Sequence, residues 1–208
     1  MKKLLLLLLT VFIGFGSLTV TAQSVTVANG TDVNNYIPLY GLWMDESQHN
    51  QIIYPESMLT NLVGKTVNTM MFFLSSEPSN SWTSSATLSV GTSATSSFST
   101  ATHDQSPVSQ IYSGSINITG GIVTFVLDST FTYNGGNLLL DVTTVGGNYS
   151  SANFFGTAQM GASMYAYGSS SSGVQNFIPK TMFVYGNCLA PTNLAVDSIT
   201  QTSAMVTW

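Results

Sequence analysis

The sequence predicts an all-β fold, an antiparallel β-sandwich or jelly-roll-like domain, and three features point to it. Short segments that alternate apolar and polar residues, or are rich in β-branched and aromatic residues, recur along the chain. Turn-forming residues separate them, as at Gly120-Gly121 and Asn134-Gly135-Gly136. Beyond the N-terminal segment, no apolar repeat with the period of a long helix is present. Closely spaced strands without intervening helices favour antiparallel pairing.

The first 22 residues are predicted to be a secretory signal peptide. Lys2 and Lys3 follow the initiating Met, residues 4–13 are apolar except for Thr10, and small residues precede the expected cleavage site after Ala22. The apolar run covers about ten residues, whereas a helix that spans a bilayer needs roughly 20. We therefore expect cleavage, a secreted or cell-surface location, and no membrane insertion of the processed chain.

A β-sandwich domain is predicted over residues 23–187. Its expected strands are Ser24–Ala28, Tyr36–Trp43, Gln51–Tyr54, Thr66–Leu74, Ala86–Val90, Val108–Tyr112, Ser115–Ile118, Ile122–Leu127, Asn137–Val142, Ala152–Phe155 and Thr181–Tyr185. One helical turn is expected after Pro55, around residues 58–63. The apolar runs Asn68–Leu74 and Asn137–Val142 are typical of central strands. Trp43 is assigned to the core.

A change of composition near residue 187 predicts a second domain over residues 188–208. Pro191 and Leu194, followed by Ser-Ala-Met-Val-Thr-Trp at 203–208, resemble the first two strands of a fibronectin type III domain. Because such a sandwich needs about 100 residues, this segment is interpreted as its incomplete start, a hairpin. Cys188 is the only cysteine, so it has no partner for an internal disulfide and is interpreted as a structural or unpaired thiol.

Residues 24–186 resemble, more loosely, the amino-terminal β-sandwich modules of secreted Gram-negative bacterial surface proteins, in which such modules precede fibronectin type III repeats. The segments that carry the resemblance are Val25–Thr31, Ile53–Pro55, Met71–Ser75, Phe131–Leu139 and Phe177–Thr181. The resemblance implies adhesion or glycan handling at the cell surface. It supplies no catalytic residues.

The composition excludes nucleic acid as a main partner. The chain holds four Lys, no Arg and nine acidic residues, for a formal net charge of −5. Nucleic-acid binding depends on cationic side chains that displace counterions from phosphates. Apolar residues make up 44% of the chain, enough to build a core. With charged residues at only 6%, the 29 Ser, 26 Thr and 15 Asn must supply most of the surface that faces water.

Catalytic chemistry has little support in the sequence. A Ser-His-Asp triad needs an oriented histidine, and the only two, His49 and His103, lie in polar stretches. Two His and one Cys without ligand spacing do not make a zinc site, and the adjacent pair Asp45-Glu46 is a poor match to the two separated carboxylates of a glycosidase. We therefore expect a protein that is not an enzyme.

No cofactor is expected, although a structural calcium ion stays open as an alternative. The hard oxygen ligands that calcium prefers could come from five acids: Asp45, Glu46, Asp104, Asp128 and Asp141. No Asp-x-Asp-x-Asp loop gathers them, so the competing interpretation is solvated loop carboxylates.

Aromatic residues near turns give the candidate binding site. Trp82 lies among Ser, Asn and Thr, and Tyr149, Tyr165 and Tyr167 lie beside Gly-rich or Ser-rich turns. An exposed ring can stack on the C–H face of a sugar while neighbouring amides bond its hydroxyls. These four residues are the predicted ligand-binding residues. The alternative for Trp82 is that it packs into the sandwich as the first residue of a strand.

The sequence is thus interpreted as a secreted or cell-surface noncatalytic binding or adhesion module whose partner is an extracellular glycan or a surface protein. Two alternatives stay open. One is a structural spacer or matrix subunit, and the other is an accessory domain of a larger extracellular enzyme.

Overall fold

A computed structural model describes residues 22–41, 45–168, 171–186, 195–197 and 205–207. Residues 23–187 form one compact unit, and its described part is almost entirely antiparallel β-sheet, which confirms the predicted all-β, sandwich-like fold. No helix in the described ranges is both long and apolar enough to cross a bilayer. Residues 1–21 of the predicted signal peptide (residues 1–22), Trp43 and Cys188 lie outside the described residues.

In the described residues, twelve strands and the short 3₁₀ turns η2 and η3 build this unit. In chain order they are β1 (Gln23–Val27), β2 (Asp32–Asn34), β3 (Gln48–Tyr54), η2 (Glu56–Met58), η3 (Thr60–Leu62), β4 (Thr66–Ser76), β5 (Ser85–Ser93), β6 (Val108–Ser115), β7 (Asn117–Thr119), β8 (Ile122–Thr132), β9 (Asn137–Val145), β10 (Asn153–Tyr167), β11 (Ser171–Pro179) and β12 (Thr181–Tyr185). The two 3₁₀ turns occupy the place where one helical turn was predicted after Pro55.

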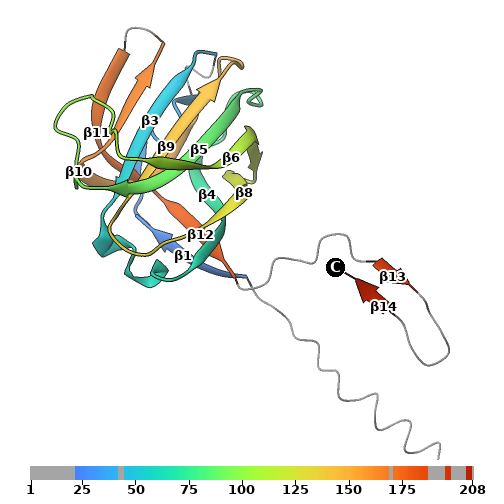
Figure 1. Ribbon diagram of the computed structural model, residues 1–208. Coiled ribbons are helices and arrows are strands. Elements are labelled where there is room, and N and C mark those ends of the chain that lie inside the picture. Colours follow the sequence, from blue (N-terminus) through green and yellow to red (C-terminus); the bar gives the residue numbers. More distant parts are fainter. Residues whose placement is uncertain (1–21, 42–44, 169–170, 187–194, 198–204, 208) are drawn as a thin grey trace, which may run out of the picture. The chain divides into compact units, whose positions relative to one another are not determined.

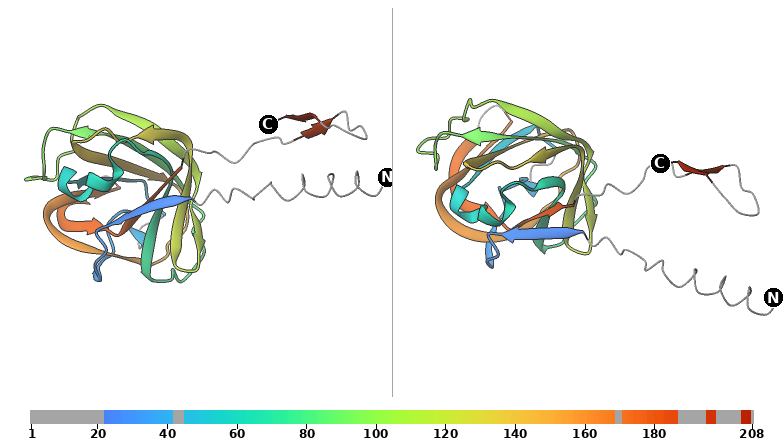
Figure 2. Two further views of the ribbon diagram at one scale, coloured as in Figure 1. Left: turned by 90° about the horizontal axis from the view of Figure 1, so that it is seen from below. Right: turned by 60° about the horizontal axis from the view of Figure 1, so that its bottom comes forward.

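The strands form one curled sheet with two layers (Figure 1). One layer has the order β1-β12-β4-β8-β7. The other has the order β10-β3-β9-β5-β6, with β2 and β11 also paired to β10. Strand β10 joins the layers, because its start pairs with β4 and its end with β3. The views in Figure 2 show the strands curling around the interior.

The bend that lets β10 serve both layers lies between Ala158 and Ser163, where its register against β11 shifts. Gly161 at this bulge has a φ of +60°, which a residue with a side chain seldom adopts. Its amide donates to the Asn176 side chain and its carbonyl accepts the amide of Phe98. The bulge therefore turns the strand and fixes a neighbouring loop at the same point.

The two predicted central strands lie in the middle of their layers. Strand β4, which contains the run Asn68–Leu74, is flanked by β12 and β8, and β9, which begins at Asn137, is flanked by β3 and β5. Phe72 of β4 is 1% exposed and meets Phe125 of β8 edge to face, with ring centroids 6.0 Å apart. The core between the layers is thus built on the strands with the longest apolar runs.

The strand predicted for Tyr36–Trp43 is wrong over its described part. Residues 36–41 form a bent segment whose backbone groups are bound by side-chain amides in place of a neighbouring strand. Asn34 accepts the amides of Tyr36 and Ile37, and Gln48 both accepts the amide and donates to the carbonyl of Tyr40. These amides satisfy the buried backbone, so the apolar residues of this segment enter the core without a ladder.

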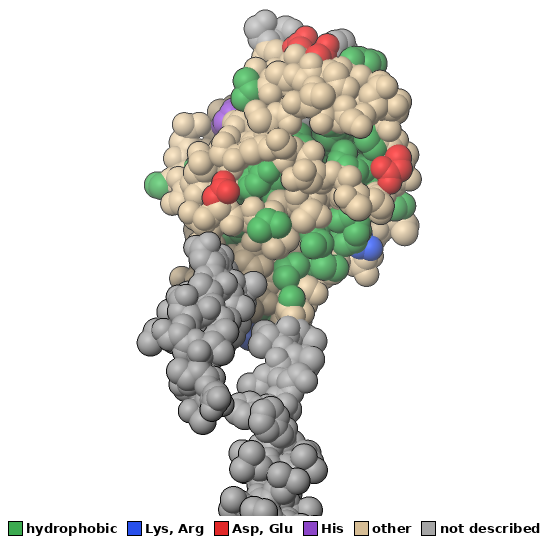
Figure 3. All heavy atoms as spheres, turned by 90° about the vertical axis from the view of Figure 1, so that its right-hand side faces the viewer, with side chains coloured by type: hydrophobic (Ala, Val, Ile, Leu, Met, Phe, Trp, Pro, Cys, Tyr) green, Lys and Arg blue, Asp and Glu red, His purple; other side chains and the backbone are tan. Residues whose placement is uncertain are grey.

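Backbone and uncharged polar side chains cover most of the surface in view in Figure 3, with isolated acidic side chains and several hydrophobic ones among them. This agrees with the expectation that hydroxyls and amides face water in a chain with 6% charged residues. At the C-terminal end, β13 (Ala195–Asp197) and β14 (Met205–Thr207) pair as an antiparallel hairpin. The fibronectin type III assignment of residues 188–208 stays a prediction, since most of them lie outside the described residues.

Candidate functional site

One hollow in the described residues lies between β6 and β8, where the two layers of the sandwich separate. Among the described strands, β6 pairs with β5 alone. Strand β8 pairs with β4, and with β7 only through residues 122–124. The other edges of β6 and β8 therefore face each other without forming a ladder, although Asp128 of β8 accepts the amide of Ser113 of β6. We call the space between these edges the β6–β8 cleft.

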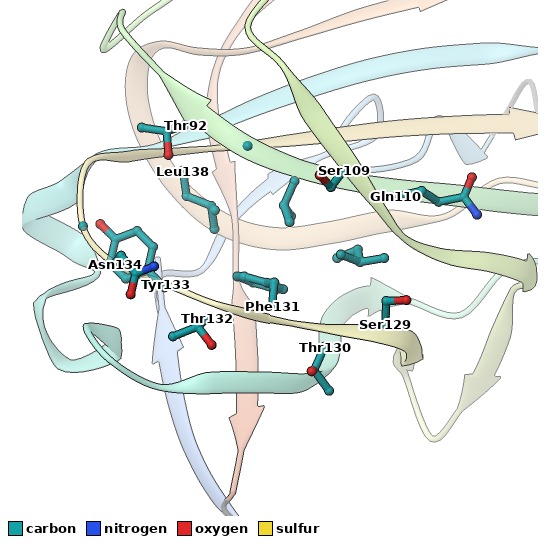
Figure 4. Close-up of a pocket in the computed structure, with 14 residues that line it drawn as sticks. Thr92, Ser109, Gln110, Ser129, Thr130, Phe131, Thr132, Tyr133, Asn134 and Leu138 are labelled. Carbon is teal, nitrogen blue, oxygen red and sulfur yellow. The ribbon is translucent and has the colours of Figure 1, made fainter.

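The β6–β8 cleft has a volume of about 290 Å³ and contains an apolar floor (Figure 4). Val90 of β5, Ile111 of β6 and Leu138 of β9 are each less than 9% exposed and contribute to the core below. Phe131 of β8 is half-buried, packs against the core and contributes an aromatic ring to the lining. A ligand in the cleft would therefore meet apolar carbon at its base.

The rim of the cleft is polar and uncharged. It is formed by the hydroxyl or amide side chains of Thr92, Ser109, Gln110, Ser129, Thr130, Thr132 and Asn134. Thr132 shares a hydrogen bond with Thr66. Within the described part of the chain, the side chains of Ser109, Ser129 and Asn134 make no hydrogen bond. Their donors and acceptors are thus available to a ligand.

Tyr133 is the one ionisable side chain among the described residues that line the cleft. Its hydroxyl donates to the carbonyl of Gly136. Burial raises the pKa of Tyr133, and the negative charge of Glu56 raises it further. Among the described residues that line the cleft, no side chain is therefore charged at neutral pH.

The predicted ligand-binding residue Trp82 is not exposed. Only 7% of its surface is accessible, and its ring lies against Phe154 at a centroid distance of 6.3 Å. The alternative weighed from the sequence was that Trp82 packs into the sandwich as the first residue of a strand; it does pack into the core, but it precedes β5 and lies on no strand. Its edge does line a second hollow of about 350 Å³ with Glu77 and Asn117. Because the ring face is covered by the core, it is not a stacking platform for a sugar.

The other three predicted residues lie on two elements. Tyr165 and Tyr167, on the same face of β10, stack with ring centroids 5.8 Å apart. Tyr36 and Tyr40 extend this stack, at 4.3 Å from Tyr165 and 4.9 Å from Tyr167 respectively. The ring faces of this cluster are largely occupied by one another. Tyr149 lies apart from β10, in the β9–β10 connection, and is 56% exposed.

The two histidines, separated by 54 residues in the chain, meet on the outer face of the β3–β9 pair. The rings of His49 and His103 are stacked 3.7 Å apart at 15°. His49 Nε2 lies 2.8 Å from an Asp141 carboxylate oxygen, and His103 Nε2 lies 3.2 Å from the backbone oxygen of His49. Gln51 donates to the same oxygen of Asp141 at 2.7 Å. This cluster was not predicted, because both histidines lie in polar stretches of the sequence.

The electrostatics of the cluster follow from burial and from these hydrogen bonds. Burial lowers the pKa of His103, and the neighbouring His49 lowers it further, while the bond to the His49 carbonyl acts in the opposite direction. Burial alone would raise the pKa of Asp141, but hydrogen bonds from His49 and Gln51 bring it below its ordinary value. No serine hydroxyl is hydrogen-bonded to either imidazole in the described residues, so the cluster does not form a triad.

The five acids considered for calcium do not converge. Asp128 binds the amide of Ser113 on β6, the carboxylate of Asp104 binds Ser93, and that of Asp141 binds His49 and Gln51. In the described ranges, no three His, Cys, Asp or Glu side chains gather in a way that could hold a metal ion.

Comparisons of the chain with protein-family models, with curated proteins and with solved structures found no match. The site must therefore be interpreted from its own geometry. Of the features above, the β6–β8 cleft is the one that combines a hollow, an apolar floor and unpaired polar groups.

Proposed function

We propose that the chain is a secreted or cell-surface, noncatalytic binding or adhesion module, and that it binds an uncharged glycan in the β6–β8 cleft. The secreted location rests on the predicted signal peptide over residues 1–22. The sequence suggested exposed aromatic residues as the glycan site, and the proposal assigns glycan binding to the β6–β8 cleft instead.

The chemistry of the cleft is the observation that carries the proposal. A sugar ring presents apolar C–H groups on its faces and hydroxyls at its edge. The cleft presents apolar carbon from Val90, Phe131 and Leu138 at its floor. Unpaired hydroxyl and amide groups of Ser109, Ser129 and Asn134 surround that floor. Such a few polar groups around an apolar base are typical of small-molecule sites.

In the described lining of the cleft there is no acid, lysine or histidine, which supports a neutral ligand and a noncatalytic role. General acid–base chemistry needs a group that can exchange a proton near the working pH. Tyr133 does not meet this requirement, since its pKa is raised. A charged ligand would lose its hydration without gaining a partner charge.

The size of the cleft sets an expectation for affinity. About 290 Å³ is near the lower end of the roughly 300 to 1,000 Å³ common for ligand pockets. It suits one or two sugar units, with weak binding at each site. An adhesion module would gain strength from repeated contacts with a polymer, because linked sites raise the effective concentration.

Binding of neutral oligosaccharides, measured by calorimetry, tests the proposal. The panel contains gluco-, manno- and galacto-oligosaccharides, with sialylated and sulfated ones as charged counterparts. Asn134→Ala should weaken binding of a neutral ligand about 2- to 10-fold, the equivalent of one neutral hydrogen bond. Ser129→Tyr should abolish binding, since a large ring would fill the cleft.

The matched control is Asn117→Ala, which removes an exposed amide on β7 outside the cleft and should leave affinity unchanged. The proposal is contradicted if no neutral oligosaccharide binds. It is equally contradicted if Ser129→Tyr, still folded by circular dichroism, binds as the unmodified protein does.

A further inference from the structure

The connection between β5 and β6, residues 94–107, which we call the β5–β6 loop, begins with a hydrogen bond from the Asn137 side chain of β9 to the Thr95 carbonyl and then contacts the outer face of the sheet at two further points. The first is apolar. Phe98 is 8% exposed and packs with Ile53, Leu139 and Met164 in a small cluster. Its backbone amide donates to the carbonyl of Gly161 at 2.7 Å. None of these groups titrates, so this attachment is independent of pH.

The second attachment is polar and contains both histidines of the chain. His103 of the loop stacks on His49 of β3, and Asp104 exchanges hydrogen bonds with the Gln51 side chain: its amide donates to Gln51 at 2.7 Å and its carbonyl accepts from Gln51 at 3.1 Å. Gln51 in turn donates to Asp141 of β9. The loop is thus fixed to two strands through one continuous network.

Hydrogen bonding fixes where the protons of the two imidazoles lie. The partner of His49 Nε2 is a carboxylate oxygen of Asp141, and the partner of His103 Nε2 is a carbonyl oxygen. Both partners accept, so each ring carries its first proton on Nε2. A second proton then goes to Nδ1 and makes the ring a cation. With rings 3.7 Å apart, two such cations would lie face to face.

The charged groups around the pair can compensate one of these cations. Asp141 is the carboxylate that touches the pair, through His49. Asp104, on the loop itself, is engaged by Ser93 and by the amide of Ser106. Neither Lys65 nor Lys180 takes part in the network, since each lies against an aromatic ring on another element. Asp141 supplies one negative charge beside the stacked rings, whereas two protonated rings would carry two positive charges.

We propose that the stacked pair His49–His103 is a pH-sensitive attachment that holds residues 103–107 of the β5–β6 loop to the sheet at neutral pH and releases them when both rings are protonated. Release would act on the β6–β8 cleft, because these residues lead directly into β6. The carbonyl of Pro107 lies so close to Gly91 of the cleft that a Cβ there would collide with it. The effect on ligand binding rests on the proposed function; the release itself does not.

Hydrogen exchange of the full chain, corrected for intrinsic rates and measured between pH 7.5 and 4.5, tests the release without any ligand. Protection of amides in residues 103–107 should fall by up to about tenfold for each pH unit below about 6.5, since the open loop binds the proton more tightly. Amides of β4 and β9 should keep their protection. His103→Phe retains the stacked ring but cannot be protonated, so its loop should stay protected across this range.

Two results would overturn the proposal: unchanged protection of residues 103–107 down to pH 4.5, or the same loss in His103→Phe. Should His103→Phe not fold, NMR titration of the two rings in the unmodified protein decides the question. One ring should protonate at a lower pH than the other, whereas two independent titrations near pH 6.5 would refute the coupling. Absence of glycan binding at every pH would count against the proposed function and leave these measurements unaffected.

Discussion

Two neighbouring phenylalanines on β4 allow a direct test of where the core lies. Phe72 points inward and is 1% exposed, whereas Phe73 is half-buried on the opposite face, with the Lys180 ammonium 4.7 Å from its ring centroid. Each is changed to Ala in a separate variant. The two substitutions remove the same atoms from adjacent positions of one strand, so that they differ mainly in burial.

Replacing Phe72 should lower the free energy of unfolding by about 4 kcal/mol. Deletion of a buried Phe side chain costs roughly 3 to 5 kcal/mol, because a cavity is left. The upper half of that range applies here, since Phe72 lies opposite Thr181 of β12 and Val123 of β8, and strands on both sides limit any collapse. It also loses the edge-to-face contact with Phe125. Phe73→Ala should cost about 1 kcal/mol, from a solvent-facing cation–π contact and partial burial.

Urea denaturation followed by far-ultraviolet circular dichroism measures both values. The midpoint should fall far more for Phe72→Ala than for Phe73→Ala, with an unchanged denaturant slope. Phe72→Asp should give no soluble protein, because it would bury an unpaired carboxylate. Equal destabilisation by the two alanine variants, or a larger effect of Phe73→Ala, would show that the faces of β4 are assigned incorrectly.

Two further predictions concern alkaline pH and proteolysis. Burial raises the pKa of Tyr54, so its neutral form stabilises the fold fully below about pH 10 and this contribution is lost as pH rises further. Tyr54→Phe should lower the free energy of unfolding by about 1 kcal/mol at pH 7, because the bond to Thr181 is lost, and chemical denaturation should show that it loses less stability than the unmodified protein between pH 9 and 11. Identical losses of stability in the two proteins over this pH range would contradict the assignment. Trypsin should leave the native 23–187 unit uncut after Lys65 and Lys180 in mass spectra, because the Lys65 carbonyl and the Lys180 amide are both hydrogen-bonded within the fold; rapid cleavage at either lysine would show that its surroundings open.

The strands with strong apolar patterns could be predicted from the sequence. The runs that contain Phe72 and Leu140 lie where a strand covered by neighbours on both sides was expected. The predicted strand at Tyr36 failed for a physical reason: an apolar run can enter the core as a bent segment when amides such as Asn34 and Gln48 bind its backbone. Nothing in a local pattern reveals those distant partners.

The second half of β10 and all of β11 were missed because glycine and serine were interpreted as turn formers. Gly161 sits at a bulge inside β10, and only the segment around Gly168 is a true turn between the two strands. In a chain with so few charged residues, serine and threonine occur both in strands and in turns. Their presence therefore does not distinguish one from the other.

The candidate site was harder to predict than the fold. The rim residues Ser109, Ser129 and Asn134 belong to the commonest polar types in this chain, so composition could not single them out. Their role follows from the separation of β6 and β8, a tertiary feature. The exposed ring expected at Trp82 instead fills the core, since a polar neighbourhood in sequence does not set burial.

NMR titration of the isotopically labelled protein with neutral oligosaccharides tests the central claim most directly, because it reports both binding and its location. The account predicts saturable shifts of the backbone amides of Ser109 and Ser129 and of the side-chain amide of Asn134, with little change around Tyr165 or Trp82. Saturable shifts that centre on Tyr165 or Trp82, or no shift with any neutral sugar, would contradict it.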